Sequence, residues 1–253
     1  QLEDEFRDCL DLAKYCLGTV GLLDKCTFRF SQWDPANPKN KYEGTKEQWD
    51  HAQSVMAKIL DDLDVKYDIG IDEAAFYGPK LDIQYKNVYG KEDTLVTIQI
   101  DMLLAERFGM YYTDENGEKK LPYIIHRTSL GCYERTLAYL IEHYAGALPT
   151  WMAPEQVRFL PVTDRAVDYC KEQAAKLTAQ GYRVTVDTRS EKIGKKIRDA
   201  QMEKIPYMLV VGDRDIEAGT VSPRHRADGD LGAMTLDAFT AVLKDVVDNK
   251  LQK

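Results

Sequence analysis

The spacing of apolar residues in the first half of the chain is helical at both ends and strand-like in between. Apolar residues recur every three or four positions between residues 2 and 20, which predicts an amphipathic helix. Thr45 and Gln48 form a capping box before a second apolar helix face. Strands are expected at 25–30, 65–71, 81–85, 95–101 and 123–127, with a loop at 33–44, a hairpin-type turn at 114–117 and a last helix from about Gly131. This order predicts an α+β domain in which helices pack on an antiparallel sheet.

The second half alternates strand-like and helical segments. Strands are expected at 156–162, 182–187, 206–211 and 220–226, and helices at 164–180, at 191–204 and after Thr235. We expect Asp213 and Asp215 to lie in a loop, and Pro223 to interrupt the strand before Arg224. The order predicts a small α/β domain with a mostly parallel sheet. Two prolines between residues 149 and 154 indicate a linker, so domains are expected at 1–148 and 149–253.

Composition and charge exclude several classes of protein. Hydrophobic residues make up 44% and charged residues 30%, which is typical of a globular chain. The net charge of −8 argues against a general nucleic-acid binder, although residues 151–253 carry a balance of +1 against −9 for residues 1–150. Five cysteines without a CxxC pair fit a reducing, cytoplasmic setting. No apolar run reaches the roughly 18 residues of a membrane span.

Three segments of the first half hold candidate functional residues, each with an ordinary structural alternative. His126 ends a strand, and Arg135 follows a small-residue turn at the start of a helix, where an arginine can bind phosphate. Lys80 flanks a Gly-Pro turn and could meet a phosphate or carboxylate. Thr97 and Gln99 share one face of a strand, which is costly on a central strand unless that face lines a site. A satisfied structural histidine, solvated helix charges, a plain turn and an edge strand are the respective alternatives.

The second half contains one local excess of basic residues. Seven basic residues stand against four acidic ones between residues 183 and 204. They are Arg183, Arg189, Lys192, Lys195, Lys196, Arg198 and Lys204. Contact with phosphate or RNA is one interpretation, and a solvated amphipathic helix is the other.

Six sequence blocks that occur in a fixed order carry a resemblance to a known family. They are Phe-Tyr-Gly-Pro-Lys at 76–80, Thr-Ile-Gln-Ile-Asp at 97–101, the block from His126 to Arg135, Pro-Thr-Trp at 149–151, Ser-Glu-Lys-Ile-Gly at 190–194 with Lys-Ile-Arg at 196–198, and the block 206–213. Together they resemble the threonyl-tRNA synthetases of the bacterial type, which are class II enzymes. The resemblance covers essentially the whole chain.

The resemblance implies roles for particular residues. The block from His126 to Arg135 is similar to class II motif 3, which implies that Arg135 binds the ATP triphosphate. Tyr77, Lys80, Thr97 and Gln99 match residues that line the threonine and adenylate pocket. His126 matches one of three zinc ligands of the family, whose zinc binds the amino group and hydroxyl of threonine. Residues implied to meet anticodon bases are Ser190, Arg198 and Arg224.

The resemblance also implies what lies outside this sequence. Motif 1, motif 2 and the other two zinc ligands of the family, a Cys and a His, are not in the chain. We therefore expect a C-terminal portion of the enzyme that by itself forms no threonyl-adenylate and holds no zinc tightly. ATP with Mg²⁺, threonine and threonine tRNA are the implied substrates, and the full enzyme is expected to be a homodimer. The alternative is a non-catalytic module that binds tRNA or another RNA.

Overall fold

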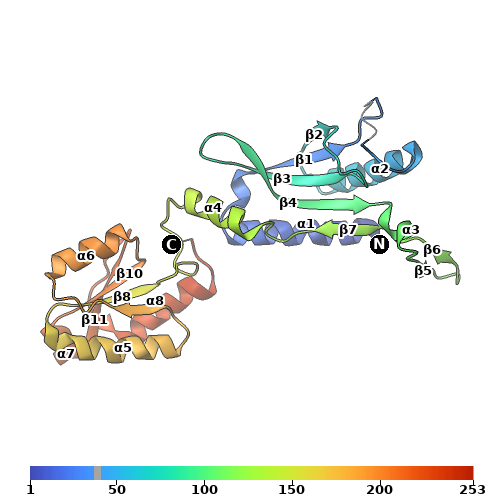
Figure 1. Ribbon diagram of the computed structural model, residues 1–253. Coiled ribbons are helices and arrows are strands. Elements are labelled where there is room, and N and C mark those ends of the chain that lie inside the picture. The colour runs from blue at the N-terminus through green and yellow to red at the C-terminus, as the bar shows by residue number, and fades with distance from the viewer. Residues whose placement is uncertain (37–40, 253) are drawn as a thin grey trace. The chain divides into compact units, whose positions relative to one another are not determined.

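The computed structural model describes residues 1–36 and 41–252 (Figure 1). The chain divides into two compact units, Gln1–Glu142 and His143–Lys253. Residues 37–40 of the loop expected at 33–44 lie outside the described residues. Within the described part, none of the helices is long and apolar enough to cross a lipid bilayer.

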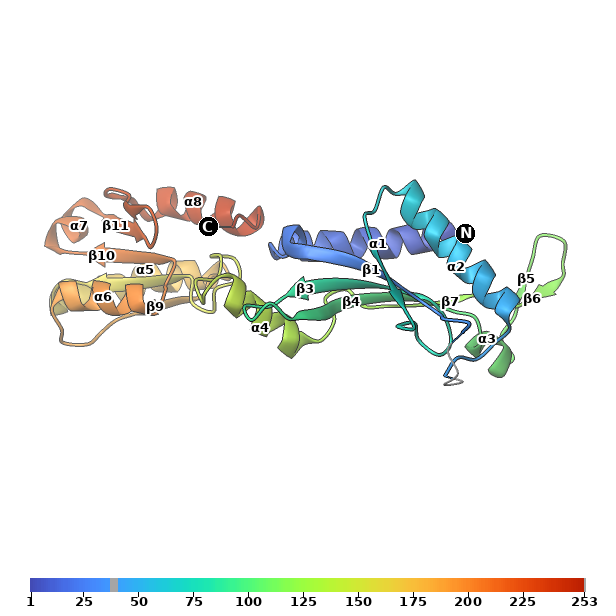
Figure 2. The same ribbon diagram turned by 90° about the horizontal axis from the view of Figure 1, so that it is seen from above.

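The first unit is a mixed sheet with the helices α1 (Leu2–Thr19) and α2 (Lys46–Asp62) on one face (Figures 1 and 2). The strand order is β2-β1-β3-β4-β7, and every neighbouring pair is antiparallel except β1 and β2. A short β5–β6 hairpin stands apart from this sheet. The elements are α1 (Leu2–Thr19), a 3₁₀ turn (Leu23–Lys25), β1 (Cys26–Gln32), α2 (Lys46–Asp62), β2 (Asp68–Ile71), β3 (Lys80–Lys86), β4 (Glu92–Asp101), α3 (Leu104–Arg107), β5 (Tyr112–Thr113), β6 (Lys119–Lys120), β7 (Ile124–Arg127) and α4 (Tyr133–His143).

The core of the first unit lies between its helices and one face of the sheet. α1 packs against α2 and β4. The predicted capping box of α2 is confirmed, because Thr45 and Gln48 exchange side-chain and backbone hydrogen bonds. Val96, Ile98 and Ile100 of β4 are fully buried, as are Phe6 and Leu10 of α1. The opposite face of β4 keeps the polar residues predicted from the alternation.

The second unit is a three-layer α/β fold. β9, β8 and β10 run parallel, β11 joins β10 in the antiparallel direction, and β12 and β13 pair with β11. α5 and α8 enclose one apolar cluster, and α6 encloses a smaller one that includes Leu160 and Met208. The elements are β8 (Val157–Pro161), a 3₁₀ turn (Asp164–Ala166), α5 (Val167–Ala179), β9 (Val184–Val186), α6 (Ile193–Met202), β10 (Tyr207–Val211), α7 (Asp213–Ala218), β11 (Thr220–His225), β12 (Gly229–Asp230), β13 (Met234–Thr235) and α8 (Leu236–Asp248).

Two local expectations in the second unit are wrong. Asp213 and Asp215 lie in α7, where the Asp215 carboxylate accepts a hydrogen bond from the Gly212 amide at 2.9 Å and so caps the helix. Pro223 does not interrupt β11. Its carbonyl accepts from the Leu231 amide at 2.9 Å, on the side away from β10. The nitrogen of a strand residue faces the same way as its carbonyl, so the missing N–H removes no bond to β10.

The segment before β8 is held to the second unit by Arg226. Its guanidinium donates to the carbonyls of Ala147 at 2.8 Å, Leu148 at 2.7 Å and Lys204 at 2.9 Å. Lys204 in turn donates to the carbonyl of Ala145. These bonds explain why the second compact unit begins at His143, upstream of the prolines that indicated a linker.

Candidate functional site

The polar face of β4 forms a row of side chains across three strands. Lys80 of β3 pairs with Gln99 of β4, and Gln99 pairs with His126 of β7. Thr97 pairs with Asp82 one step along. Because paired residues of neighbouring strands point to the same face, these side chains share one surface. β4 is an internal strand, so the edge-strand alternative is excluded.

Tyr77 is brought onto this face by the Gly-Pro turn that precedes β3. The Tyr77 hydroxyl donates to Gln99 Oε1, and its ring lies 5.4 Å from the His126 ring, centroid to centroid. The turn is packed tightly against β4, since a Cβ added at Gly78 would lie 1.8 Å from the Ile100 carbonyl oxygen. This close approach requires glycine, and the turn is therefore more than a plain surface turn.

Asp82 is a buried carboxylate at the centre of the polar face, and it is not among the residues that the sequence predicted for the site. Only 1% of Asp82 is exposed. It accepts from Ser31 Oγ at 2.9 Å, from Thr97 Oγ1 at 2.7 Å and from the Lys80 ammonium. The signal was available, because Asp82 and Gln84 alternate with Leu81, Ile83 and Tyr85, the same pattern that singled out Thr97 and Gln99. The Asp82 carboxylate thus accepts hydrogen bonds from three side chains, and two of them are the predicted site residues Lys80 and Thr97.

His126 is paired with a second buried carboxylate. Its Nε2 lies 2.8 Å from Asp101 Oδ2, and Asp101 is fully buried while the His126 side chain is 41% exposed. The other oxygen, Asp101 Oδ1, accepts from the backbone amides of Leu103 at 2.8 Å and Leu104 at 3.0 Å. The ring is therefore held at one nitrogen by a carboxylate that is itself fixed to the backbone.

No three His, Cys, Asp or Glu side chains of the described residues are arranged to hold a metal ion. The donor chemistry at His126 nevertheless fits one ligand of such a site, because a ligating histidine commonly donates its other ring N–H to a carboxylate. The remaining ligands of a metal bound here would come from outside the described residues.

Arg135 lies in the first turn of α4, as expected, but far along β4 from His126. Its Nη1 donates to the carbonyl of Thr94 at 2.8 Å. Thr94 and Gln99 are five residues apart on the strand, or about 16 Å at the usual rise. Gly131 makes the turn before α4 possible, since its φ is +71° and an added Cβ would lie 1.8 Å from the Leu95 carbonyl oxygen. The candidate site is therefore an elongated surface with Arg135 at one end and His126 at the other.

In the second unit, the three residues implied to contact RNA lie around one face of the sheet. Ser190 is exposed in the loop between β9 and α6, and Arg198 is exposed on α6. Arg224 pairs with Met208 of β10, and Met208 packs among apolar residues of α6. Arg224 therefore stands on the α6 side of the sheet, where its Nη1 lies 3.3 Å from Asp230 Oδ2.

Much of the basic run at 183–204 is engaged within the protein. Lys196 is buried, and its ammonium donates to the carbonyls of Pro161 and Asp187 at 3.1 Å each. Arg189 donates to the carboxylates of Asp187 and Asp199. Arg183 binds two backbone carbonyls, and Lys195 bonds Glu191. Both sequence interpretations therefore overestimate the free positive charge of this run.

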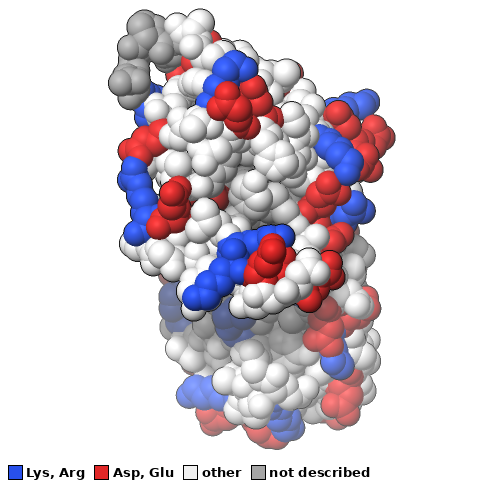
Figure 3. All heavy atoms as spheres, turned by 90° about the vertical axis from the view of Figure 1, so that its right-hand side faces the viewer, with Lys and Arg blue, Asp and Glu red and all other residues white. Residues whose placement is uncertain are grey.

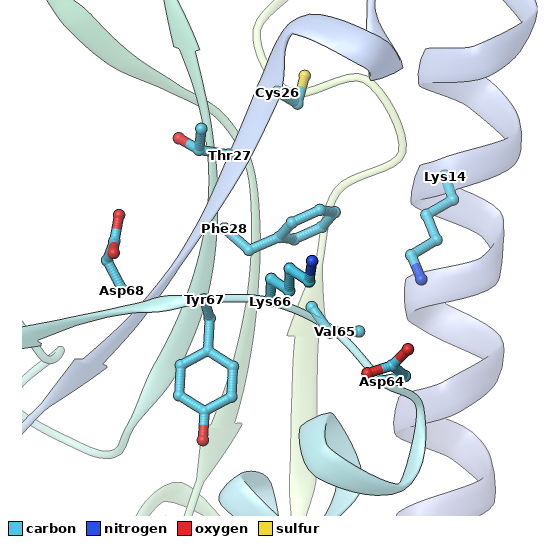
Figure 4. A pocket seen from close by; sticks show the side chains of 9 residues that line it. All are labelled: Lys14, Cys26, Thr27, Phe28, Asp64, Val65, Lys66, Tyr67 and Asp68. Carbon is cyan, nitrogen blue, oxygen red and sulfur yellow. The ribbon is translucent and has the colours of Figure 1, made fainter.

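Two further parts of the surface of the first unit carry charges of both signs. Figure 3 shows the end that carries α3 and the β5–β6 hairpin, where acidic and basic side chains are intermixed around uncharged surface. Figure 4 shows a hollow of about 440 Å³ between α1 and the start of β1. Its lining includes Lys14, Lys66, Asp64 and Asp68, so charges of both signs are present. Burial raises the pKa of the Cys26 thiol in this hollow to about 11, which leaves it protonated near neutral pH.

Comparison with known proteins bears on both units. Residues 1–144 match the model of the tRNA synthetase class II core domain (G, H, P, S and T), and residues 156–246 match that of the anticodon binding domain. A threonine–tRNA ligase of Clostridium perfringens is 57% identical over 239 residues, which cover 94% of this chain and 37% of that protein. One of Clostridium botulinum is 53% identical over 99% of this chain and 39% of its own length. The chain thus spans about two fifths of the curated relatives it matches.

Solved structures give the same picture at lower identity. The RNA binding domain of threonyl-tRNA synthetase from Cryptosporidium parvum superposes with a TM-score of 0.86, at 32% identity, over 97% of this chain and 60% of that chain. A putative threonyl-tRNA synthetase from Aeropyrum pernix gives 0.78 at 25% identity, over 98% and 61%. These likenesses confirm the two fold classes and the family resemblance inferred from the sequence blocks. With a core-domain match over more than half of its length, the chain belongs to the class II tRNA synthetase family, and its curated relatives are threonine–tRNA ligases.

Proposed function

We propose that this chain is part of a threonine–tRNA ligase that activates threonine with ATP and transfers it to the 3′ end of its tRNA. The observation that carries the proposal is the organised polar face of β4, where Tyr77 bonds Gln99 and Asp82 holds Lys80 and Thr97. This face lies within the residues that match the class II core domain. Its side chains form a prearranged set of hydrogen-bond donors and acceptors for a small polar substrate.

Threonine and its adenylate are the ligands we assign to this face. The hydroxyl, amide and ammonium groups of Tyr77, Gln99, Thr97 and Lys80 can bond the amino, hydroxyl and phosphate groups of such ligands. A site that binds the substrate hydroxyl, as zinc would at the His126 end, rejects the isostere without it, because the partners of the hydroxyl would be left unpaired. This supplies a physical basis for selecting threonine over valine.

The ATP triphosphate and a zinc ion would bind at the two ends of the face. Arg135 would bind the ATP triphosphate, and bound Mg²⁺ would offset its charge as pyrophosphate leaves. His126 would hold zinc together with ligands from outside this sequence, and zinc supplies a Lewis acid that binds amino and hydroxyl groups. We expect the whole enzyme to be a cytoplasmic homodimer.

The second unit would read the anticodon. Ser190, Arg198 and Arg224 border the α6 side of its sheet, and unpaired anticodon bases offer hydrogen-bonding edges to such side chains. A base contact by Arg198 would contribute about 1–3 kcal/mol to binding.

The test is tRNA binding by this chain at near-physiological salt. Threonine tRNA is compared with the same tRNA carrying a swapped anticodon, and with an Arg198→Ala variant of the chain. We expect a clear preference for the threonine anticodon, which the variant loses. Equal binding of both tRNAs by the unaltered chain would contradict anticodon reading by the second unit.

A second candidate is an RNA-binding module without chemistry. It is favoured by the likeness to a solved RNA binding domain that covers 97% of this chain. Threonine-dependent pyrophosphate exchange separates the candidates when it is measured on this chain and on the longer enzyme that carries motif 2. We expect exchange by the longer enzyme and none by this chain. Anticodon-specific binding without exchange in either protein would support the module.

A further inference from the structure

Asp101 is a fully buried carboxylate beside the candidate site to which the proposed function gives no role. It ends β4, and its two oxygens have different partners. Oδ1 accepts the backbone amides of Leu103 and Leu104, at 2.8 and 3.0 Å, while Oδ2 lies 2.8 Å from His126 Nε2. The two amide bonds fix the orientation of the carboxylate, and only Oδ2 remains to face the histidine.

This arrangement determines where the His126 ring carries its proton. An ionised carboxylate can only accept hydrogen bonds, so Nε2 must be the donor. A neutral imidazole has one N–H and one lone pair, which leaves the lone pair on Nδ1. The Tyr77 ring also lies beside the imidazole, 5.4 Å away between ring centroids.

We propose that Asp101 is a positioning residue that holds His126 as the Nε2–H tautomer and so makes Nδ1 the nitrogen that binds zinc. The assignment of the tautomer rests on geometry alone, and its use for zinc rests on the proposed function. This role also explains why an acid is buried at position 101. Another residue could accept the amides of Leu103 and Leu104 before α3, but it could not fix the tautomer of His126.

We expect the change Asp101→Asn to move the His126 ring proton from Nε2 to Nδ1. The asparagine Oδ1 stays on the amides of Leu103 and Leu104, which need an acceptor. Its NH₂ group then faces Nε2 and donates to it, so the ring proton must move to Nδ1. The inversion removes the lone pair from Nδ1 with almost no change in shape, as in the Asp→Asn change of a catalytic triad.

The tautomer is measured by ¹⁵N NMR of the imidazole nitrogens in this chain, which has four histidines. His126 is assigned from the signals lost in His126→Gln, and the pH is raised until its own shifts show a neutral ring. We expect the Nε2–H form in the unaltered chain and the Nδ1–H form in Asp101→Asn. Asp93→Asn, on the same strand and bonded to Tyr139, is the matched control and should leave the Nε2–H form unchanged.

The tautomer of His126 in the unaltered chain tests the proposal even if Asp101→Asn fails to fold. A neutral His126 in the Nδ1–H form, or as a mixture of tautomers, would overturn the proposal. So would an Asp101→Asn variant that folds and keeps the Nε2–H form.

Zinc affinity of the longer enzyme tests the second half of the proposal. Competition with a chelator should show a loss of about 10–100-fold in Asp101→Asn and none in Asp93→Asn. If the tautomer inverts and zinc affinity is unchanged, Nδ1 does not bind zinc. The proposal that Asp101 sets the tautomer of His126 then holds, and the proposal that Nδ1 binds zinc fails. If neither variant nor the unaltered enzyme binds zinc, the zinc part of the proposed function fails instead.

Discussion

The two units use buried charge in opposite ways. In the first unit, the buried carboxylates Asp82 and Asp101 hold polar side chains on an open face of the sheet. In the second, the buried Lys196 and the partly buried Arg226 hold backbone carbonyls. In the proposed function the first arrangement would prepare side chains for a ligand, whereas the second arrangement fixes the chain. The two pairs differ in their partners, because most bonds of Asp82 and Asp101 go to side chains, whereas the bonds of Lys196 and Arg226 go to backbone carbonyls.

The largest expected effect concerns the turn that delivers Arg135. Gly131→Ala places a Cβ 1.8 Å from a carbonyl oxygen at a positive φ, whereas Gly117 has a similar φ of +79° with nothing within 4 Å. We expect Gly131→Ala to lower the free energy of unfolding of the first unit by about 3 kcal/mol and Gly117→Ala by about 1 kcal/mol. Urea unfolding followed by circular dichroism measures both. Equal losses would mean that the turn adapts and that close packing does not fix Arg135.

The second prediction separates structural from exposed cations on one helix. Lys196→Met leaves two buried carbonyls without a donor, so the second unit should lose about 2 kcal/mol of unfolding free energy. Arg198→Met, on an exposed side of the same helix, should change stability by less than about 0.5 kcal/mol. Thermal unfolding of the whole chain measures both variants. A larger loss for Arg198→Met would reverse the assignment of the two residues.

A smaller, pH-dependent effect is expected at Asp187. Hydrogen bonds from Arg189 hold the pKa of this carboxyl below its usual range. The stabilisation is fully present above about pH 4 and is lost as the pH falls through the lowered pKa. Because Arg189 is half exposed, Asp187→Asn should cost only about 1–2 kcal/mol at pH 7, and the difference should shrink below about pH 4. Denaturant titrations at several pH values test this, and a difference independent of pH would contradict it.

The smallest effect is on cysteine reactivity. Burial raises the pKa of Cys170 to about 12, and Cys26 is similarly shifted, whereas Cys132 is exposed beside the candidate site. Iodoacetamide at about pH 8 should therefore modify Cys132 first and Cys170 only after unfolding. Peptide mass spectrometry of timed samples measures the order. Early modification of Cys170 would indicate local opening of the second unit.

The sequence predicted much of the fold because its signals are local. The capping box at Thr45 and Gln48 and the alternation around β4 depend on neighbours a few residues apart, and both were confirmed. The signals failed where a distant partner decides the outcome. The expectation that Pro223 interrupts a strand was wrong. Only the pairing of β11 in the sheet shows that the missing N–H of Pro223 points away from β10.

The candidate site divides in the same way. Residue types and their order determined the family, the expected roles of Tyr77, Gln99, His126 and Arg135, and the two fold classes. Only the tertiary structure showed that Asp82 and Asp101 support these side chains, and that most of the basic run binds within its own unit. The physical reason is that a hydrogen bond joins residues brought together by strand register and burial, and no local pattern encodes which carboxylate a given side chain will meet.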